Sequence, residues 1–221
     1  MVGTIRYDFV IFDYDGTLAD TKEDVWRSLE YACSFFNCRI PPAFRARPSN
    51  LALSEAELFA VLCPGVGAEH FAAFCAHLKH HYRVLNDFSR TNLYPGIRDL
   101  LGKLREKQTK CYIASLKPAV PLTKLLKQQG IANYFTKWLT PDYRPGATLT
   151  KSEMVGSIRK EHPAARGVMV GDSCSDVVAG RENGLVTNGV LYGDGDTERL
   201  RCARPDFIVK TAEELIPLLT G

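Results

Sequence analysis

The 221-residue sequence has no long hydrophobic run, no closely paired cysteines and no large excess of either charge. No segment approaches the roughly 18 uninterrupted apolar residues of a membrane-spanning helix, so we expect no membrane association. The N-terminal residues show neither the apolar stretch nor the small-residue cleavage pattern of a secretory signal. We therefore predict a cytoplasmic protein.

The seven cysteines are odd in number and include no C-x-x-C pair. Disulfide frameworks use cysteines in even numbers, and structural zinc sites use closely spaced pairs. We expect neither kind of site and interpret most of these cysteines as small core residues.

The 28 basic residues nearly balance the 25 acidic ones, which leaves a net charge of +3. This balance provides no general attraction to nucleic acid or to acidic membranes, so no nucleic-acid partner is predicted. The hydrophobic fraction of 45% is that of an ordinary globular protein. The sequence does not define an oligomeric state.

Short apolar runs typical of buried parallel strands recur along the chain, and helical patterns separate most of them. The runs are Phe9–Phe12, Cys111–Ala114, Val168–Val170, Val190–Tyr192 and Phe207–Val209. The helical faces are Ile97, Leu100, Leu101 and Leu104, then Leu122, Leu125 and Leu126, then Met154, Val155 and Ile158. Strands that alternate with helices predict an α/β protein with a Rossmann-like parallel sheet and right-handed crossovers.

Residues 19–88 break this alternation, because their apolar residues follow helical spacing with no strand pattern between them. We predict a small all-helical cap domain inserted after the first strand, with residues 1–18 and 89–221 forming the catalytic core. Thr21, with Asp24 three residues later, is predicted to cap the first helix of the insertion.

Two aspartates, Asp13 and Asp15, directly follow the first apolar run. Side chains two positions apart on an extended segment face the same way, so both carboxyls can enter one crevice. Asp13 can attack a phosphoryl group and Asp15 can transfer the proton. Gly16 permits a sharp turn beside them, and Thr17 offers a hydroxyl or main-chain donor. A calcium loop needs further acids at fixed spacing and a later Glu, which do not follow here.

A second acidic motif begins after the apolar run Val168–Val170 and contains Asp172 and Asp176. Carboxyl ends of parallel strands meet at one edge of a sheet, so Asp172 and Asp13 are expected to converge. Mg²⁺ prefers oxygen ligands, and one carboxylate from each strand suits it. The alternative is that Asp172 or Ser173 only caps the next helix.

Two further residues lie where they could contact a phosphate. Ser115 ends the run Cys111–Ala114, and Lys151 precedes the helix at Met154. The Ser115 hydroxyl can bind a phosphate oxygen, and the Lys151 ammonium can separate the like charges of Asp13 and the phosphate. Taken alone, each could also be an ordinary strand-end serine and a solvated lysine.

In this order, the four segments resemble the motifs of the haloacid dehalogenase superfamily. They are Asp13-Tyr14-Asp15-Gly16-Thr17, Ser115, Lys151 and Gly171-Asp172-Ser173-x-x-Asp176. The helical insertion and the tail around Val190-Leu191-Tyr192-Gly193 are similar to the phosphoglycolate phosphatase branch.

The resemblance implies a Mg²⁺-dependent phosphatase that acts on a small phosphorylated metabolite through an aspartyl-phosphate on Asp13. It implies that Asp15 is the general acid and base, and that Ser115 and Lys151 complete the catalytic set. The implied metal ligands are Asp13, the main-chain oxygen of Asp15, and Asp172, with Asp176 in support. The implied substrate-binding residues are Gly16, Thr17, Leu116 and Lys117.

Two positions depart from the pattern of that branch. Leu116 stands where the branch usually has Asn, and Ser152 stands where it usually has Pro. The contacts that the Asn would make to phosphate or substrate are therefore absent. The catalytic positions themselves are retained.

The motifs also bear on three other functions. A phosphomutase of the β-phosphoglucomutase type would return the phosphoryl group to a bound substrate, and the motifs do not separate it from a phosphatase. A non-catalytic phosphate-binding relative would have no physical reason to keep four converging acids. A 2-haloacid dehalogenase lacks the second acid, so Asp15 argues against that activity.

Overall fold

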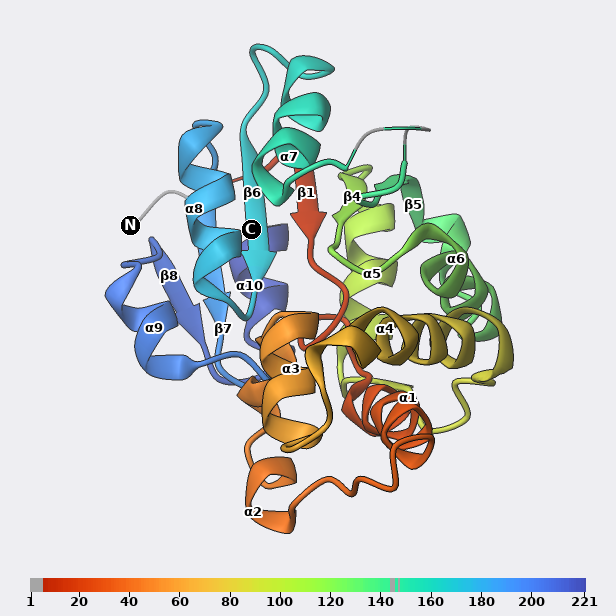
Figure 1. Ribbon diagram of the computed structural model, residues 1–221. Helices are drawn as coiled ribbons and strands as arrows, with labels where there is room; N and C mark the ends of the chain where they lie inside the picture. Colours follow the sequence, from red (N-terminus) through yellow and green to blue (C-terminus); the bar gives the residue numbers. More distant parts are fainter. Residues whose placement is uncertain (1–5, 144–145, 147) are drawn as a thin grey trace. The chain divides into compact units, whose positions relative to one another are not determined.

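The computed structural model describes residues 6–143, 146 and 148–221. The chain divides into two compact units, one formed by Met1–Asp20 with Asn92–Gly221 and the other by Thr21–Thr91. These divisions lie within a few residues of the predicted domain boundaries. Figure 1 shows a sheet flanked by helices in the first unit and helices alone in the second.

The first unit is built on a six-stranded sheet whose order is β5-β4-β1-β6-β7-β8. Its strands are β1 (Phe9–Phe12), β4 (Lys110–Ala114), β5 (Phe135–Leu139), β6 (Gly167–Gly171), β7 (Val186–Val190) and β8 (Phe207–Val209). All neighbouring strands of this sheet are parallel. The predicted α/β class with a Rossmann-like parallel sheet is confirmed.

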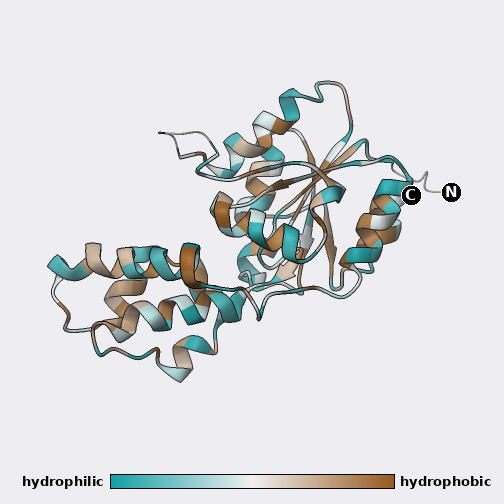
Figure 2. Ribbon diagram, turned by 90° about the vertical axis from the view of Figure 1, so that its right-hand side faces the viewer, coloured by the Kyte–Doolittle hydropathy of each residue, from teal (hydrophilic) through white to brown (hydrophobic). Residues whose placement is uncertain are grey.

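The central strands β1 and β6 are buried at every position, as strands covered on both faces must be. In Figure 2 the strands of this sheet are coloured as largely hydrophobic. Residues from β1, α7 (Lys151–Lys160) and α8 (Cys174–Glu182) share one apolar cluster. The other helices of the unit are α5 (Ile97–Glu106), α6 (Ala119–Gln128), α9 (Thr197–Cys202) and α10 (Leu215–Thr220), with a 3₁₀ turn at Ala132–Tyr134.

Two strands of the sheet differ from the prediction. The expected strand at Val190–Tyr192 is wrong, because β7 spans Val186–Val190 and Tyr192 lies in the following loop. The polar residues Thr187 and Asn188 interrupt the apolar run of β7, so the sequence pattern does not indicate a strand there. Strand β5 was not expected, because an edge strand with Lys137 at its centre does not need a continuous apolar run.

A short antiparallel pair lies where the chain leaves and re-enters the first unit. Strand β2 (Ala19–Asp20) pairs with β3 (Asn92–Leu93). Strands of two residues carry no readable sequence pattern, so this pair was not predicted.

The second unit is helical throughout its regular elements. It contains α1 (Lys22–Ser34), α2 (Pro42–Arg45), α3 (Glu55–Leu62), α4 (Phe71–His80), 3₁₀ turns at Pro48–Ala52 and Ala68–His70, and a π-helical turn at His81–Leu85. Its core includes Trp26, Leu29, Phe59 and Phe74. That this unit acts as a cap remains a prediction.

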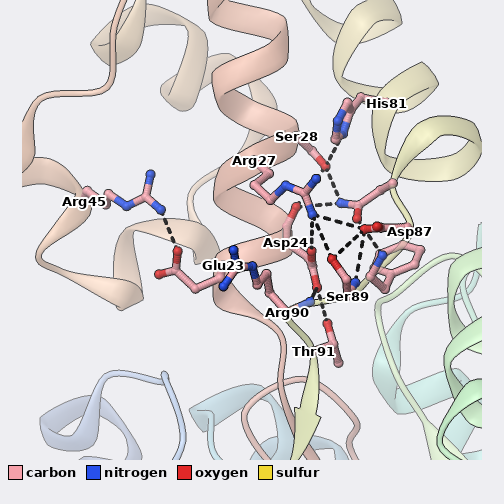
Figure 3. A network of polar contacts seen from close by, with 12 residues as sticks. Glu23, Asp24, Arg27, Ser28, Arg45, His81, Asp87, Ser89, Arg90 and Thr91 are labelled. Atoms are coloured by element: carbon pink, nitrogen blue, oxygen red, sulfur yellow. Dashed lines mark hydrogen bonds and ion pairs between the residues drawn. The ribbon is translucent and has the colours of Figure 1, made fainter.

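The helix cap predicted at Thr21 is wrong. Thr21 makes no side-chain capping bond to α1. The fully buried carboxylate of Asp24 instead accepts hydrogen bonds from the main-chain N–H of Arg90 at 3.1 Å and from Thr91 Oγ1 at 2.8 Å (Figure 3). Asp24 thus joins the start of α1 to the segment that leaves this unit. Sequence spacing could not reveal a bond between residues so far apart along the chain.

None of the helices within the described ranges is both long and apolar enough to cross a membrane. All seven cysteines fall within these ranges and are free thiols.

Candidate active site

The aspartate motifs lie at the carboxyl edge of the sheet, where its topology reverses. From β1 the chain passes to β4 and β5 on one side, whereas β6, β7 and β8 lie on the other. Phe12 is in register with both Ile113 and Val170, so the residues that follow these three positions meet at one edge. In open α/β sheets such a switch point forms the ligand crevice.

The carboxylates of Asp13, Asp172 and Asp176 form one buried cluster. One oxygen from each lies within 4.8 Å of the other two. Burial raises the pKa of Asp13 to about 6, although the Lys151 ammonium opposes this shift. Burial, with the neighbouring Asp176 and Asp13 carboxylates, also raises the pKa of Asp172 well above its ordinary value. Carboxylates gathered in this way need a nearby cation to stay ionised.

Lys151 supplies one such cation. It is the first residue of α7, where the Thr150 side chain caps the helix. Its Nζ lies 2.7 Å from Asp13 Oδ2 and 2.6 Å from Asp176 Oδ1. Burial lowers the pKa of Lys151, but the two carboxylates outweigh burial and raise it, so the ammonium remains charged.

Asp176 uses both oxygens within the protein. Oδ1 accepts from Lys151, and Oδ2 accepts from the main-chain N–H of Ser173 at 3.0 Å and from its hydroxyl at 2.6 Å. Ser173 is the N-cap residue of α8. These bonds join the Asp176 carboxylate to the N-cap residue of α8 and so fix the carboxylate that holds Lys151.

Asp15 contacts a different lysine. Its Oδ1 lies 2.9 Å from Lys117 Nζ, and the Lys117 side chain has no exposed surface. The Lys117 side chain was expected to bind substrate, whereas the structure pairs it with the expected acid–base residue. Since Lys117 follows β4 and Asp15 follows β1, the pair also links two neighbouring strand ends.

Gly16 lies directly against Asp172. Its φ of 72° is in the left-handed region, and a Cβ at this position would collide with the Asp172 carboxylate. Glycine therefore allows the turn after β1 to approach the second acidic motif. Thr17 is fully buried, and within the described chain its Oγ1 has no hydrogen-bond partner.

Ser115 and Leu116 differ in exposure. Ser115 is buried at the end of β4, and its Oγ accepts a hydrogen bond from the main-chain N–H of Lys117 at 3.2 Å. Leu116 is 54% exposed and therefore lies outside the buried carboxylate cluster.

The donor set fits Mg²⁺, which prefers hard oxygen ligands. Asp13 and Asp172 offer carboxylate oxygens from adjacent strand ends, and their raised pKa values mark a place where added positive charge is favourable. The two oxygens of Asp176 are already engaged, so its contacts favour support of Lys151.

Sequence reasoning missed one direct partner of the carboxylate cluster. The main-chain N–H of Gly195 donates a hydrogen bond of 2.8 Å to Asp172 Oδ2. The only signal was the run Gly193-Asp194-Gly195 after a strand, which is too common to indicate a contact by itself.

The protein has a Rossmann-like sheet, with converging carboxylates and a buried lysine at its switch point. It therefore falls in the class of α/β proteins that bind ligands at the carboxyl ends of their strands. The sequence profile of the haloacid dehalogenase-like hydrolases matches residues 10–190. The chain therefore belongs to the haloacid dehalogenase-like hydrolase family. This confirms the family predicted from the motifs and the expectation of a hydrolytic enzyme.

Three relatives are distant but match nearly the full chain. A phosphoglycolate phosphatase from Vibrio parahaemolyticus is 23% identical over 216 residues, covering 95% of each chain. A 5'-nucleotidase from Pseudomonas aeruginosa is 25% identical, covering 91% of this chain and 90% of the relative. The structure of a haloacid dehalogenase-like family hydrolase from Streptococcus pneumoniae superposes with a TM-score of 0.80 at 21% identity, covering 97% of this chain and 98% of that one.

Proposed function

We propose that this protein is a Mg²⁺-dependent phosphatase that hydrolyses a small phosphorylated metabolite through an aspartyl-phosphate on Asp13. The observation that carries the proposal is the buried cluster in which Asp13 and Asp172 converge while Lys151 holds Asp13 at 2.7 Å. Its chemistry meets the needs of phosphoryl transfer, namely a nucleophile and positive charge around it. The names of the phosphatase relatives support the same reaction class.

In the first step, an oxygen of Asp13 attacks phosphorus and the bond to the ester oxygen breaks. Asp15 donates its proton to the departing alcohol. Lys151 keeps Asp13 oriented and offsets the repulsion between its carboxylate and the approaching phosphate. The Ser115 hydroxyl is proposed to bind a non-bridging phosphate oxygen.

In the second step, Asp15 accepts a proton from water, which attacks the phosphorus and releases inorganic phosphate and the Asp13 carboxylate. Lys117 holds the Asp15 side chain on the segment that follows β1. The proposed ligands of Mg²⁺ are Asp13, the main-chain oxygen of Asp15, and Asp172. Asp176 acts through Lys151. When bound, the ion supplies positive charge to the phosphoryl oxygens.

The experiment that tests this function uses a generic aryl phosphate and the purified protein. We expect release of the phenol and of inorganic phosphate in equal amounts when Mg²⁺ is present. Chelation of divalent cations should abolish turnover, and added Mg²⁺ should restore it. Hydrolysis that persists after chelation would rule out the proposed metal dependence.

Mg²⁺ affinity is expected to rise with pH, because Mg²⁺ and a proton compete for Asp13. With a pKa of about 6 in the metal-free protein, Asp13 is mostly protonated at pH 5.5 and ionised at pH 7.5. This titration alone weakens Mg²⁺ binding roughly fourfold at the lower pH, and the raised pKa of Asp172 acts in the same direction. Isothermal titration calorimetry at both pH values measures the difference, and equal affinities would contradict it.

Leu116 is expected to disfavour substrates whose leaving group carries a carboxylate. Its exposed side chain offers no hydrogen bond beside Ser115, and Lys117 is already paired with Asp15. We predict a lower kcat/KM for phosphoglycolate than for a nucleoside 5'-monophosphate. Leu116→Asn should raise kcat/KM for phosphoglycolate, relative to kcat/KM for the nucleoside 5'-monophosphate, by on the order of tenfold. This is the effect of one hydrogen bond to a charged group.

The matched control for this prediction is Val178→Asn, which changes another exposed apolar residue, on α8. It should leave the ratio of the two kcat/KM values unchanged. A preference for phosphoglycolate in the unmodified protein would contradict the predicted role of Leu116 without affecting the reaction class.

A further inference from the structure

We propose that the loop Tyr192–Gly195 is a positioning element that sets the affinity of the site for Mg²⁺ by fixing Asp172 and the Gly16–Thr17 turn relative to each other. The inference rests on the proposed function and adds residues that the catalytic steps do not use. The loop follows β7 and reaches both segments that carry the proposed metal ligands.

The first contact fixes the Asp172 carboxylate. Its Oδ2 accepts the main-chain N–H of Gly195 at 2.8 Å. The carboxylate is buried among like charges, which favour its rotation away from them. The main-chain donor of Gly195 opposes that rotation.

The second contact fixes the turn that follows β1. The hydroxyl of Tyr192 donates a hydrogen bond of 2.8 Å to the main-chain oxygen of Thr17. The ring of Tyr192 packs edge-on against Tyr94, with centroids 4.8 Å apart. The hydroxyl therefore has a partly buried, well-supported position from which to hold the turn.

The third contact is steric, because the loop packs so closely on Gly16 and Asp172 that Gly193 and Gly195 have no room for a side chain. A Cβ on Gly193 would collide with the main-chain oxygen of Gly16 and would lie 2.5 Å from Asp172 Cβ. A Cβ on Gly195 would collide with the main-chain oxygen of Asp172. Glycine at both positions lets the loop pack on the backbone of the turn and of the second acidic motif.

Together the three contacts connect the loop to the turn after β1 and to Asp172 after β6, the two segments that carry the proposed metal ligands. Groups that orient metal ligands without touching the metal typically change affinity by about 10- to 100-fold when they are altered. We expect Tyr192→Phe to raise the Mg²⁺ dissociation constant by roughly tenfold, and Gly193→Ala to raise it further because a backbone atom must move.

Two control variants match these changes. Tyr94→Phe removes a neighbouring tyrosine hydroxyl whose oxygen is buried and, among the described residues, has no hydrogen-bond partner. Gly102→Ala adds a methyl group in α5, where nothing lies within 4 Å of the new Cβ. Both should leave the Mg²⁺ dissociation constant unchanged.

The experiment measures Mg²⁺ binding to each full-length variant by isothermal titration calorimetry, with thermal unfolding as a check on folding. Asp172→Asn serves as the reference for a lost ligand. Weaker binding by Tyr192→Phe and Gly193→Ala, with both controls like the unmodified protein, is the expected result.

Three other outcomes would overturn the inference. If the unmodified protein binds Mg²⁺ and Tyr192→Phe binds it equally well, the loop has no positioning role and the proposed function stands. If Tyr94→Phe weakens binding as much as Tyr192→Phe, the hydroxyl bond to Thr17 is not the cause. If the unmodified protein and Asp172→Asn bind Mg²⁺ alike, the metal site itself fails.

Discussion

Asp13→Asn is expected to reduce phosphate-ester hydrolysis by on the order of 10⁴-fold or more, because it removes the proposed nucleophile. The amide keeps the shape of the carboxylate but has no anionic oxygen to attack phosphorus. The variant should still fold, since burial already penalises the charge on Asp13 and raises its pKa to about 6. Loss of turnover without loss of the thermal unfolding transition would therefore report on chemistry.

The measurement is the rate of aryl phosphate hydrolysis at saturating Mg²⁺, compared with an aspartate variant at the surface. Asp99→Asn changes an exposed residue of α5 whose ion pair with Lys103 is a solvent-facing contact at 3.2 Å. It should retain full activity. A rapid-quench experiment with labelled substrate should detect a phosphorylated protein for Asp99→Asn and none for Asp13→Asn.

Undiminished hydrolysis by Asp13→Asn would show that another group attacks phosphorus. A covalent phosphoenzyme that persists in Asp13→Asn would lead to the same conclusion and would move the nucleophile elsewhere on the carboxyl edge. Either result would reject the proposed mechanism while leaving the family assignment intact.

The convergence of Asp13 and Asp172 could be expected from sequence because both follow fully apolar strands. Parallel strands buried on two faces give continuous apolar runs, so the ends of β1 and β6 can be located from the sequence. Those ends identify the residues that reach the sheet edge. Strand β7 was misplaced for the opposite reason. Its Thr187 and Asn188 are buried polar residues, and hydropathy alone does not mark them as part of a strand.

Sequence patterns predict the contact between Lys151 and Asp13 but not the other ion pairs of the catalytic candidates. Lys151 was expected beside Asp13, but its second bond, to Asp176, depends on how α7 and α8 pack together. Lys117 was assigned to substrate, and only the adjacency of β1 and β4 brings it to Asp15. Such contacts join residues distant in the chain, and their geometry is set by packing.

Lys151→Met is expected to lower the free energy of unfolding by about 3–5 kcal/mol at pH 8, the usual cost of leaving a buried charge without its partner. The methionine fills a similar volume but leaves Asp13 and Asp176 unneutralised beside Asp172. For a chain of this size the loss corresponds to a fall in Tm of roughly 10 °C. Activity should fall with it, because Asp13 loses the cation that orients it.

The control is Lys137→Met, which removes an ion pair of similar length, 2.7 Å to Glu161, with both side chains partly exposed. It should lower the free energy of unfolding by less than about 1 kcal/mol.

The stability loss caused by Lys151→Met should be smaller at pH 5.5 than at pH 8. Asp13, with its pKa raised to about 6, is largely protonated at the lower pH and needs the ammonium less. Chemical denaturation at the two pH values measures this difference. Equal losses for the two lysine variants would mean that the buried carboxylates do not depend on Lys151, and Asp13 would then have to be oriented by its bond from the Tyr14 N–H, at 2.7 Å, and by Mg²⁺.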